Sequence, residues 1–272
     1  MPRNNDRDKT MSQNILDKIV LRKKEEVALA KQQVSVKDLE NNPVFSRTPY
    51  RFKDFLLAKD RTGIIAEFKK QSPSKGVING NADVKAITQA YNAAGASALS
   101  VLTDTDFFGG KKEDLLQARS VNQIPILRKD FMIDEYQILE AKAWGADIIL
   151  LIASILTPQQ IADYGKFAQS LGLNVLLEVH DLAELERSIC PHLDAIGVNN
   201  RNLVDFTVNI QTSFDLVDKI PNEFLKISES AISNPQTIKD LKQVGFQGFL
   251  IGENFMKTEN PGLAMREFVG EL

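Results

Sequence analysis

The strongest constraint on the fold is a regular alternation of short apolar runs with segments of helical periodicity, which begins near residue 63. The expected strands are 63–68, 98–102, 125–128, 147–152, 174–178, 195–198, 225–228 and 248–251. The expected helices are 83–94, 113–119, 134–144, 157–171, 181–189, 209–218, 234–244 and 261–270. Eight strand–helix units in about 210 residues are typical of a (β/α)8 TIM barrel, in which parallel strands close into a cylinder surrounded by helices.

A doubly wound open sheet is the alternative interpretation of the same alternation. Such a sheet usually carries a glycine-rich dinucleotide-binding loop after its first strand. The segment that follows the first expected strand, from Lys69 to Gly76, contains a single glycine. The sequence therefore favours the barrel.

A helical extension is expected before the barrel. Residues 1–11 are polar and mixed in charge, and we expect them to be disordered. Residues 12–32 are expected to form a helix that Ser12 caps, with residues 22–26 largely on its solvent side. Its apolar positions, which recur near a period of 3.6 residues, are Ile15, Ile19, Val20, Val27 and Ala28.

Two short helices are expected in the rest of the extension. The first covers 36–40, where Ser35 can cap the first turn. The second covers 52–58, after two prolines have broken the chain. We therefore divide the chain into an extension, residues 1–60, and a barrel domain, residues 61–272.

Composition excludes several classes of function. The formal net charge is −3, so local groups rather than overall charge must attract an anionic ligand, and no nucleic-acid partner is expected. One cysteine, Cys190, suits a reducing compartment, and two histidines make a histidine-rich metal site unexpected. No apolar run reaches the roughly 20 residues of a membrane span, and no signal-peptide core is visible. We expect a cytoplasmic protein without a membrane partner; the sequence leaves the oligomeric state open, with a monomer favoured.

Charged and amide side chains lie at the ends of the expected strands. In a (β/α)8 barrel the carboxyl ends of all strands meet at one face, where active sites lie. Glu67 and Lys69 are two residues apart, so both point to the same face of a strand. Charges buried there are costly unless they are paired or used. Three glutamates and two lysines at one face therefore predict a catalytic pocket, whose candidate residues are Glu67, Lys69, Lys129, Glu178, Asn199 and Glu229.

A phosphate site is expected at the last two strand ends. Barrels often bind phosphate with the backbone N–H groups of these loops and the N-terminus of a short extra helix. The corresponding residues are Ser230 and Ala231 after the seventh strand and Gly252 and Glu253 after the eighth. Lys69 can supply the counter-charge.

These residues fall in seven segments that resemble a known family. The segments, in chain order, are 67–74, 102–110, 127–131, 177–180, 197–203, 228–230 and 250–252. Together they resemble indole-3-glycerol phosphate synthase, the indole-forming enzyme of tryptophan biosynthesis, from about residue 12 to the end. The family's helical extension over the barrel mouth corresponds to residues 12–58. Two residues depart from the family pattern, because Ala231 stands where glycine is usual and Glu253 where serine is common.

The resemblance implies a substrate, 1-(2-carboxyphenylamino)-1-deoxyribulose 5-phosphate, and a reaction without cofactor or metal. The reaction closes a ring and expels carbon dioxide and water. Lys129 matches the acid that protonates the C2′ oxygen as an aromatic carbon attacks. Lys69, Glu178 and Glu67 share the roles in dehydration, with Lys69 or Glu178 as the acid and Glu67 as the base.

The resemblance also implies contacts with the substrate. Asn199 and Glu229 would hold the sugar hydroxyls and the anilino group. Phe108 and Phe131 would clamp the anthranilate ring, with packing in the core as the alternative.

The anionic groups of the substrate need further partners. Arg201 and Ser72 are candidates, with a surface salt bridge as the alternative for Arg201. Glu253 is expected to turn its side chain to solvent and to offer its backbone N–H to the phosphate. His180 is expected to pack or form a hydrogen bond rather than to catalyse.

Two other functions compete with this interpretation. Phosphoribosylanthranilate isomerase, a phosphate-binding barrel of the same pathway, needs a cysteine and an aspartate at strand ends. Cys190 precedes the sixth strand instead, which disfavours it. A non-catalytic barrel that senses a phosphorylated ligand is the other alternative, and it has no need of both Lys69 and Lys129.

Overall fold

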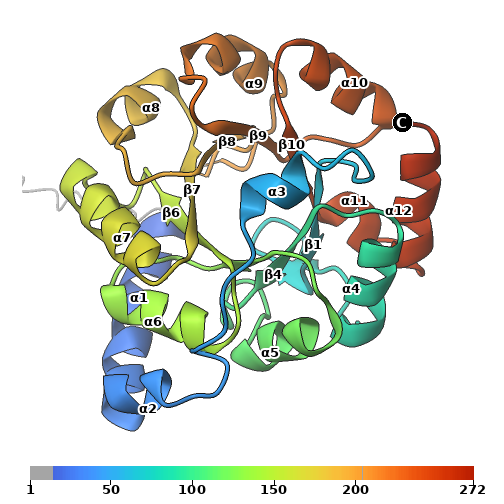
Figure 1. The fold of residues 1–272 in the computed structure, drawn as a ribbon. Coiled ribbons are helices and arrows are strands. Elements are labelled where there is room, and N and C mark those ends of the chain that lie inside the picture. The colour runs from blue at the N-terminus through green and yellow to red at the C-terminus, as the bar shows by residue number, and fades with distance from the viewer. Residues whose placement is uncertain (1–14, 204) are drawn as a thin grey trace, which may run out of the picture.

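The computed structural model describes residues 15–203 and 205–272. Eight parallel strands form a closed barrel in the order β1-β10-β9-β8-β7-β6-β5-β4 (Figure 1). These strands are β1 (Ile64–Phe68), β4 (Ala98–Leu102), β5 (Ile126–Lys129), β6 (Ile148–Ile152), β7 (Asn174–Val179), β8 (Ala195–Asn199), β9 (Leu225–Glu229) and β10 (Gly248–Ile251). Because β1 pairs with both β4 and β10, the sheet has no edge. The (β/α)8 prediction is confirmed, and the open-sheet alternative is wrong.

Helices follow the strands and surround the barrel. They are α4 (Val84–Ala93), α5 (Lys112–Val121), α6 (Glu135–Ala143), α7 (Pro158–Ser170), α8 (Leu182–Ser188), α9 (Gln211–Leu216) with the 3-10 turn η1 (Val217–Lys219), α10 (Pro235–Gln243), α11 (Glu253–Met256) and α12 (Pro261–Gly270). Side-chain caps fix several starts: Thr157 forms a capping box with Gln160, and Asn234 accepts from the N–H of Thr237. Within the described chain, no helix is both long and apolar enough to cross a membrane.

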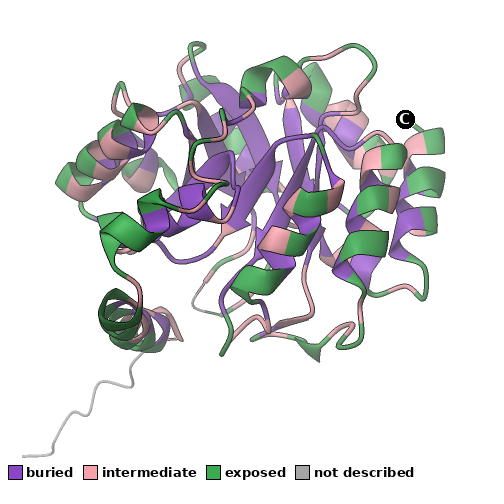
Figure 2. Ribbon diagram, turned by 60° about the horizontal axis from the view of Figure 1, so that its bottom comes forward, coloured by how far each residue is buried: buried purple, intermediate pink, exposed green. Residues whose placement is uncertain are grey.

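Alternation along the strands separates two apolar layers. Ile64, Ala66 and Phe68 of β1 face the surrounding helices, whereas Ile65 faces the barrel interior. Figure 2 shows the buried strands at the centre and helices whose outer faces are exposed. Glu67 lies on the same side of β1 as Ile65, so the strand period alone directs its carboxylate into the barrel.

The extension touches both ends of the barrel. The helix α3 (Phe52–Leu56) packs Phe52 and Leu56 against the first interior residues of several strands, among them Ala98, Ala195 and Leu225. In Figure 1 this helix lies across the centre of the barrel. It closes the amino ends of the strands, which we call the base. The expectation that the whole extension lies over the mouth, the carboxyl ends, is therefore corrected for α3.

The first helix of the extension, α1 (Ile15–Gln33), contacts the mouth with its first turns. Ile19 belongs to the apolar cluster that contains Phe131, and Ile15 packs against the same cluster. The predictions for residues 1–11 and for Ser12 lie outside the described residues. Further along, Val27 packs against α6. Ser35 caps α2 (Val36–Glu40), as predicted, and does so in a capping box with Asp38.

Two positions on α1 differ from the predicted pattern. Ala28 was expected on the apolar face but is exposed, and Lys23 was expected on the solvent side but is buried. Buried positions recur every four residues, at Ile19, Lys23 and Val27. This spacing places Lys23 in the middle of the stripe that faces the barrel.

Candidate active site

Glu67 and Lys69 form an ion pair at the end of β1. The distance between Lys69 Nζ and Glu67 Oε1 is 2.8 Å. Both side chains point into the mouth because they share one face of the chain. Ser100 on the neighbouring β4 donates to Glu67 Oε2 over 3.3 Å, so both carboxylate oxygens have a partner.

Lys129 at the end of β5 lies between two further glutamates. Its Nζ is 2.9 Å from Glu178 Oε2 on β7 and 2.8 Å from Glu229 Oε2 on β9. Asn199 on β8 donates to the other oxygen of Glu178 over 3.0 Å. The structure thus brings together all six predicted acid–base and polar residues from five strand ends.

Burial and neighbouring charges shift the pKa values of these carboxyls in opposite directions. Burial alone raises the pKa of Glu67 and Glu178, but adjacent ammonium groups, chiefly Lys69 for the first and Lys129 for the second, hold both pKa values below the ordinary range. Burial, together with repulsion from Glu178, outweighs the Lys129 ammonium at Glu229 and raises its pKa to about 7. Although burial lowers it, the surrounding carboxylates raise the pKa of Lys129. Ionised Glu67 and Glu178 therefore surround a protonated Lys129 at neutral pH.

His180 supports this cluster from β7. Its Nε2 lies 3.4 Å from Glu178 Oε1 and its Nδ1 lies 3.1 Å from Glu184 Oε2. Burial lowers the pKa of His180, but the two carboxylates raise it to about 10. The imidazolium is consistent with the predicted hydrogen-bonding role. Among the described residues, no cluster of three or more carboxylate, imidazole or thiol groups could hold a metal ion.

A cavity with an aromatic wall adjoins Lys129. Phe108 and Phe131 lie in its wall with their ring centroids 6.0 Å apart and their planes at 41°. Leu150 and Ile152 complete the apolar side, and the lysines and glutamates of the cluster form the polar side. An aromatic ring bound against this wall would lie in the cavity that Lys129 also lines.

A second, more polar cavity adjoins the first and shares Glu67, Lys69 and Arg201 with it. Its wall contains the two predicted phosphate loops, with Ser230 and Ala231 after β9 and Gly252, Glu253 and α11 after β10. Ser230 and Ala231 have φ values of 66° and 60°. This left-handed region is unfavourable for residues with a Cβ, which explains why glycine would suit the position of Ala231.

The carboxylate of Glu253 is turned toward cations rather than only to solvent. Its Oε2 lies 3.3 Å from Arg201 Nη2, and its Oε1 lies 3.8 Å from Lys75 Nζ. The expectation that Glu253 points away from the site is therefore corrected. Arg201 thus forms a half-buried salt bridge with a carboxylate of the protein itself, which was the alternative expected for it.

Ser72 lies apart from the residues that line these two cavities. It is buried in β2 (Gln71–Ser72), which pairs with β3 (Gly76–Val77) in a small hairpin after β1. Its hydroxyl lies 3.5 Å from that of Ser74. The hairpin, which the sequence analysis did not predict, carries Lys75 toward Glu253.

Two further residues shape the site, and the sequence analysis gave them no role. Ser100 orients Glu67, as described above. Gly197 on β8 faces Glu229 so closely that an added Cβ would collide with Glu229 Oε1. A glycine inside a buried strand is a signal of such a close approach.

Comparisons with known proteins show which family the chain resembles along nearly its whole length. A sequence model of the indole-3-glycerol phosphate synthase family matches residues 16–268. An indole-3-glycerol phosphate synthase of Bacteroides thetaiotaomicron is 46% identical over 259 residues, which are 94% of this chain and 98% of the relative. One from Verminephrobacter eiseniae is 45% identical over 260 residues, 93% and 97% of the two chains.

A solved structure supports the fold alone. The 3-hexulose-6-phosphate synthase of Salmonella typhimurium superposes with a TM-score of 0.60 at 12% identity, covering 77% of this chain and 97% of that one. The full-length matches in sequence go further than this likeness. The chain belongs to the indole-3-glycerol phosphate synthase family.

Proposed function

We propose that the protein converts 1-(2-carboxyphenylamino)-1-deoxyribulose 5-phosphate into indole-3-glycerol phosphate, carbon dioxide and water. The observation that carries this proposal is the position of Lys129 Nζ between Glu178 and Glu229, beside a cavity walled by Phe108 and Phe131. Ring closure needs an acid at the C2′ oxygen while the aromatic ring is bound beside it, and the position of Lys129 supports that role.

Binding engages the two adjoining cavities. The phosphate enters the polar cavity, where the backbone N–H groups of the β9 and β10 loops, together with Lys69, receive it. Arg201 exchanges the carboxylate of Glu253 for a substrate anion. The anthranilate ring enters the other cavity and packs against Phe108 and Phe131, and its edge faces the sugar carbonyl.

Ring closure depends on Lys129. As the aromatic carbon attacks C2′, negative charge develops on the carbonyl oxygen, and the Lys129 ammonium donates a hydrogen bond and then a proton to it. Its raised pKa keeps it protonated before the substrate arrives. Loss of carbon dioxide then restores the aromaticity of the ring.

Dehydration needs an acid for the leaving hydroxyl and a base for the proton on the amine nitrogen. Glu67 has a lowered pKa and is ionised, which suits the base. Glu178 also has a lowered pKa, so it is a poor acid, and we assign the acid to Lys69. Glu229 pairs with Lys129 through Oε2, and we assign it to hold a sugar hydroxyl.

The cellular location and the oligomeric state of the protein are also proposals. The single thiol, Cys190, fits the reducing cytoplasm, and we propose that the protein acts there on this phosphorylated small molecule as a monomer. Light scattering of the purified chain checks the oligomeric state.

A turnover assay tests the function directly. The purified protein is mixed with the anilino-ribulose phosphate, and the fluorescence of the indole product is followed. We expect the signal to grow in proportion to enzyme concentration. A protein that binds the substrate without producing indole fluorescence would instead be a phosphate-ligand sensor, and the proposal would be wrong.

A further inference from the structure

Lys23 on α1 is a buried lysine outside the set of residues that the reaction uses. Only 3% of its surface is exposed. A lysine buried among apolar neighbours such as Ile19 and Val27 is costly unless its ammonium is fully paired. The helix spacing directs Lys23 toward the barrel, and specific partners must compensate its charge there.

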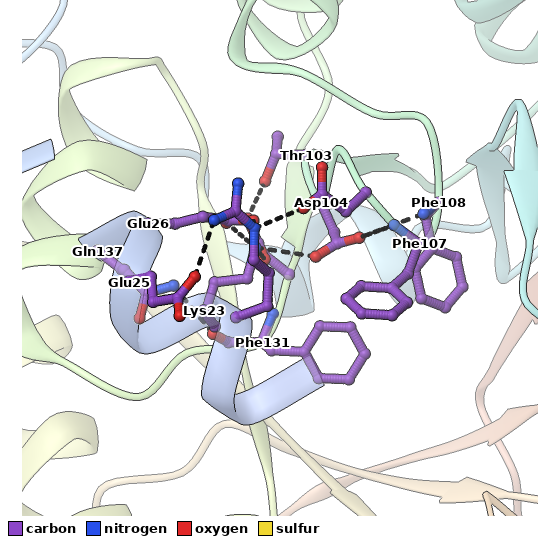
Figure 3. Close-up of polar contacts among 12 residues, drawn as sticks. Lys23, Glu25, Glu26, Thr103, Asp104, Phe107, Phe108, Phe131 and Gln137 are labelled. Atoms are coloured by element: carbon purple, nitrogen blue, oxygen red, sulfur yellow. Dashed lines mark hydrogen bonds and ion pairs between the residues drawn. The ribbon is translucent and has the colours of Figure 1, made fainter. Parts of the chain in front are cut away.

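Those partners come from three different segments. Lys23 Nζ lies 2.6 Å from Glu26 Oε2 on the same helix, 2.9 Å from Asp104 Oδ2 and 3.0 Å from Asp130 Oδ1. Asp104 follows β4 and Asp130 follows β5. The close-up in Figure 3 shows Lys23 extending from the helix toward the loop that carries Asp104. One ammonium thus joins α1 to two loops at the mouth.

The same two aspartates hold the backbone of the aromatic wall. Asp104 Oδ1 accepts from the N–H groups of Phe107, at 2.9 Å, and Phe108, at 3.2 Å (Figure 3). Asp130 Oδ1 accepts from the N–H of Phe131 over 2.8 Å. Each phenylalanine of the wall is therefore one carboxylate away from Lys23.

The two aspartates depend on Lys23 to different extents. Asp130 also pairs with Arg128 Nη2 over 3.1 Å and accepts from the hydroxyl of Thr103. Asp104 is fully buried, and within residues 15–203 and 205–272 Lys23 is the one cation paired with it. Loss of the ammonium would leave a buried carboxylate uncompensated directly beneath Phe108.

We propose that Lys23 is a positioning residue for the aromatic end of the substrate, because it fixes the Asp104 and Asp130 loops and thereby the spacing of Phe108 and Phe131. This inference rests on the proposed function, in which these two rings clamp the anthranilate ring. Ile19, one turn before Lys23, packs in the same cluster as Phe131. The helix α1 therefore packs against the aromatic wall through Ile19 and is paired with its supporting aspartates through Lys23.

The test compares Lys23→Met with Lys31→Met in steady-state turnover of the anilino-ribulose phosphate. Lys31 is a matched control on the same helix, because its Nζ pairs over 2.7 Å with Asp134, the N-cap of α6, at an exposed site and with neither Asp104 nor Asp130. We expect kcat/KM to fall by about 10- to 100-fold in Lys23→Met, the size of a small misplacement near the chemistry. Lys31→Met stays within about twofold of the wild type.

Two further measurements separate positioning from general loosening. The inhibition constant of inorganic phosphate, which probes the other cavity, is expected to change less than about twofold in Lys23→Met, since a tenfold change would need about 1.4 kcal/mol. Combining Lys23→Met with Phe108→Ala is expected to cost little more than the larger single change, because both act on one ring. Lys23→Arg, which keeps the charge, is expected to restore part of the activity.

Each outcome bears on the proposal. The proposal is overturned if Lys23→Met and Lys31→Met have the same kcat/KM. It is also overturned if Lys23→Met loses as much affinity for phosphate as it loses in kcat/KM, or if its effect multiplies with that of Phe108→Ala. Wild-type turnover would still support the proposed function in each of these cases. Absence of turnover by the wild type overturns both. If Lys23→Met does not fold, as circular dichroism will show, Lys23→Gln replaces it and faces the same criteria.

Discussion

At the base of the barrel, α3 closes the amino ends of the strands with Phe52 and Leu56, both of them buried. At the mouth, the carboxyl ends surround Lys129 with carboxylates whose own hydrogen-bonding capacity is only partly used. At the base, each buried methylene group adds to the stability of the fold. Buried charges at the mouth tend to cost stability, and they are kept where chemistry needs them.

The residues that stabilise the fold and the residues proposed to catalyse the reaction therefore lie at opposite ends of the barrel. Folding of the barrel depends little on the side chains at the mouth, and the reaction depends little on the side chains at the base. The segment before β1 is the exception, since α3 belongs to the base and the first turns of α1 belong to the mouth. A substitution in this segment can therefore affect either property, depending on which helix it changes.

The largest effect is expected from Lys129→Met at the mouth. The change keeps the length of the side chain but removes the acid for ring closure, so we expect kcat to fall by about 10²–10⁴. Lys226, near the base on β9, donates its ammonium to the carbonyl of Val217 over 3.0 Å and is the matched buried lysine. Lys226→Met should leave kcat nearly unchanged. Near-normal turnover by Lys129→Met would show that Lys129 is not the acid for ring closure.

Phe52→Ala is expected to have the converse effect at the base. Removing a fully buried phenylalanine should lower the free energy of unfolding by about 3–5 kcal/mol, measured by urea denaturation. KM of the remaining folded protein should stay the same. Phe108→Ala at the mouth should do the opposite, raising KM with a small loss of stability, and a stability loss as large as that of Phe52→Ala would contradict the separation of the two ends.

The pH dependence of kcat/KM is expected to report on Glu229. With a pKa raised to about 7, this carboxyl is protonated below that pH and ionised above it. Because the ionised form accepts hydrogen bonds from Lys129 and the substrate hydroxyls, kcat/KM should rise as the pH increases through about 7.

The variant Glu229→Gln isolates this ionisation. A substrate phosphate also titrates near pH 6, so its contribution should remain in the variant while the limb near pH 7 disappears. If the wild type and the variant keep the same limb, the titrating group is the substrate rather than Glu229.

The smallest effect is expected from Ala231→Gly. Relief of a left-handed backbone saves about 1–2 kcal/mol, and the extra freedom of glycine in the unfolded chain costs about 0.4–1 kcal/mol. We expect a net gain of about 0.5–1 kcal/mol in thermal or urea unfolding. Ala28→Gly on the exposed side of α1 is the matched control and should destabilise the protein by about 1 kcal/mol. A gain in both variants, or in neither, would show that the φ of Ala231 stores no strain.

Much of the fold could be predicted from the sequence because its signals are local. The eight barrel strands lie within one residue of their predicted ends, since apolar runs and turn residues mark them directly. The charged cluster was also predictable, because Glu67 and Lys69 interrupt an apolar run where a strand must end. The register of a parallel barrel then brings all strand ends together.

The remaining features depend on contacts between distant parts of the chain. Nothing within the 36–58 segment indicates which end of the barrel α3 covers. Lys23 was assigned to solvent because lysines are rarely buried, and its partners at Asp104 and Asp130 lie in loops far along the sequence. The expected orientation of Glu253 follows from repulsion by the phosphate and from the first turn of a short helix, whereas the structure adds Arg201 as a competing partner.

During synthesis on the ribosome, α3 emerges before any strand of the barrel. The side chain of Asn174, which accepts from the N–H of Phe52 over 3.1 Å, is made 122 residues later, and Leu225 of β9 later still. At a synthesis rate of about 5–20 residues per second, roughly 10–40 s pass between the synthesis of Phe52 and Leu56 and that of the last strands that cover them. The nascent chain therefore carries an uncovered apolar face through most of its synthesis, and a chaperone that recognises such faces has its binding site ready from the first sixty residues onward.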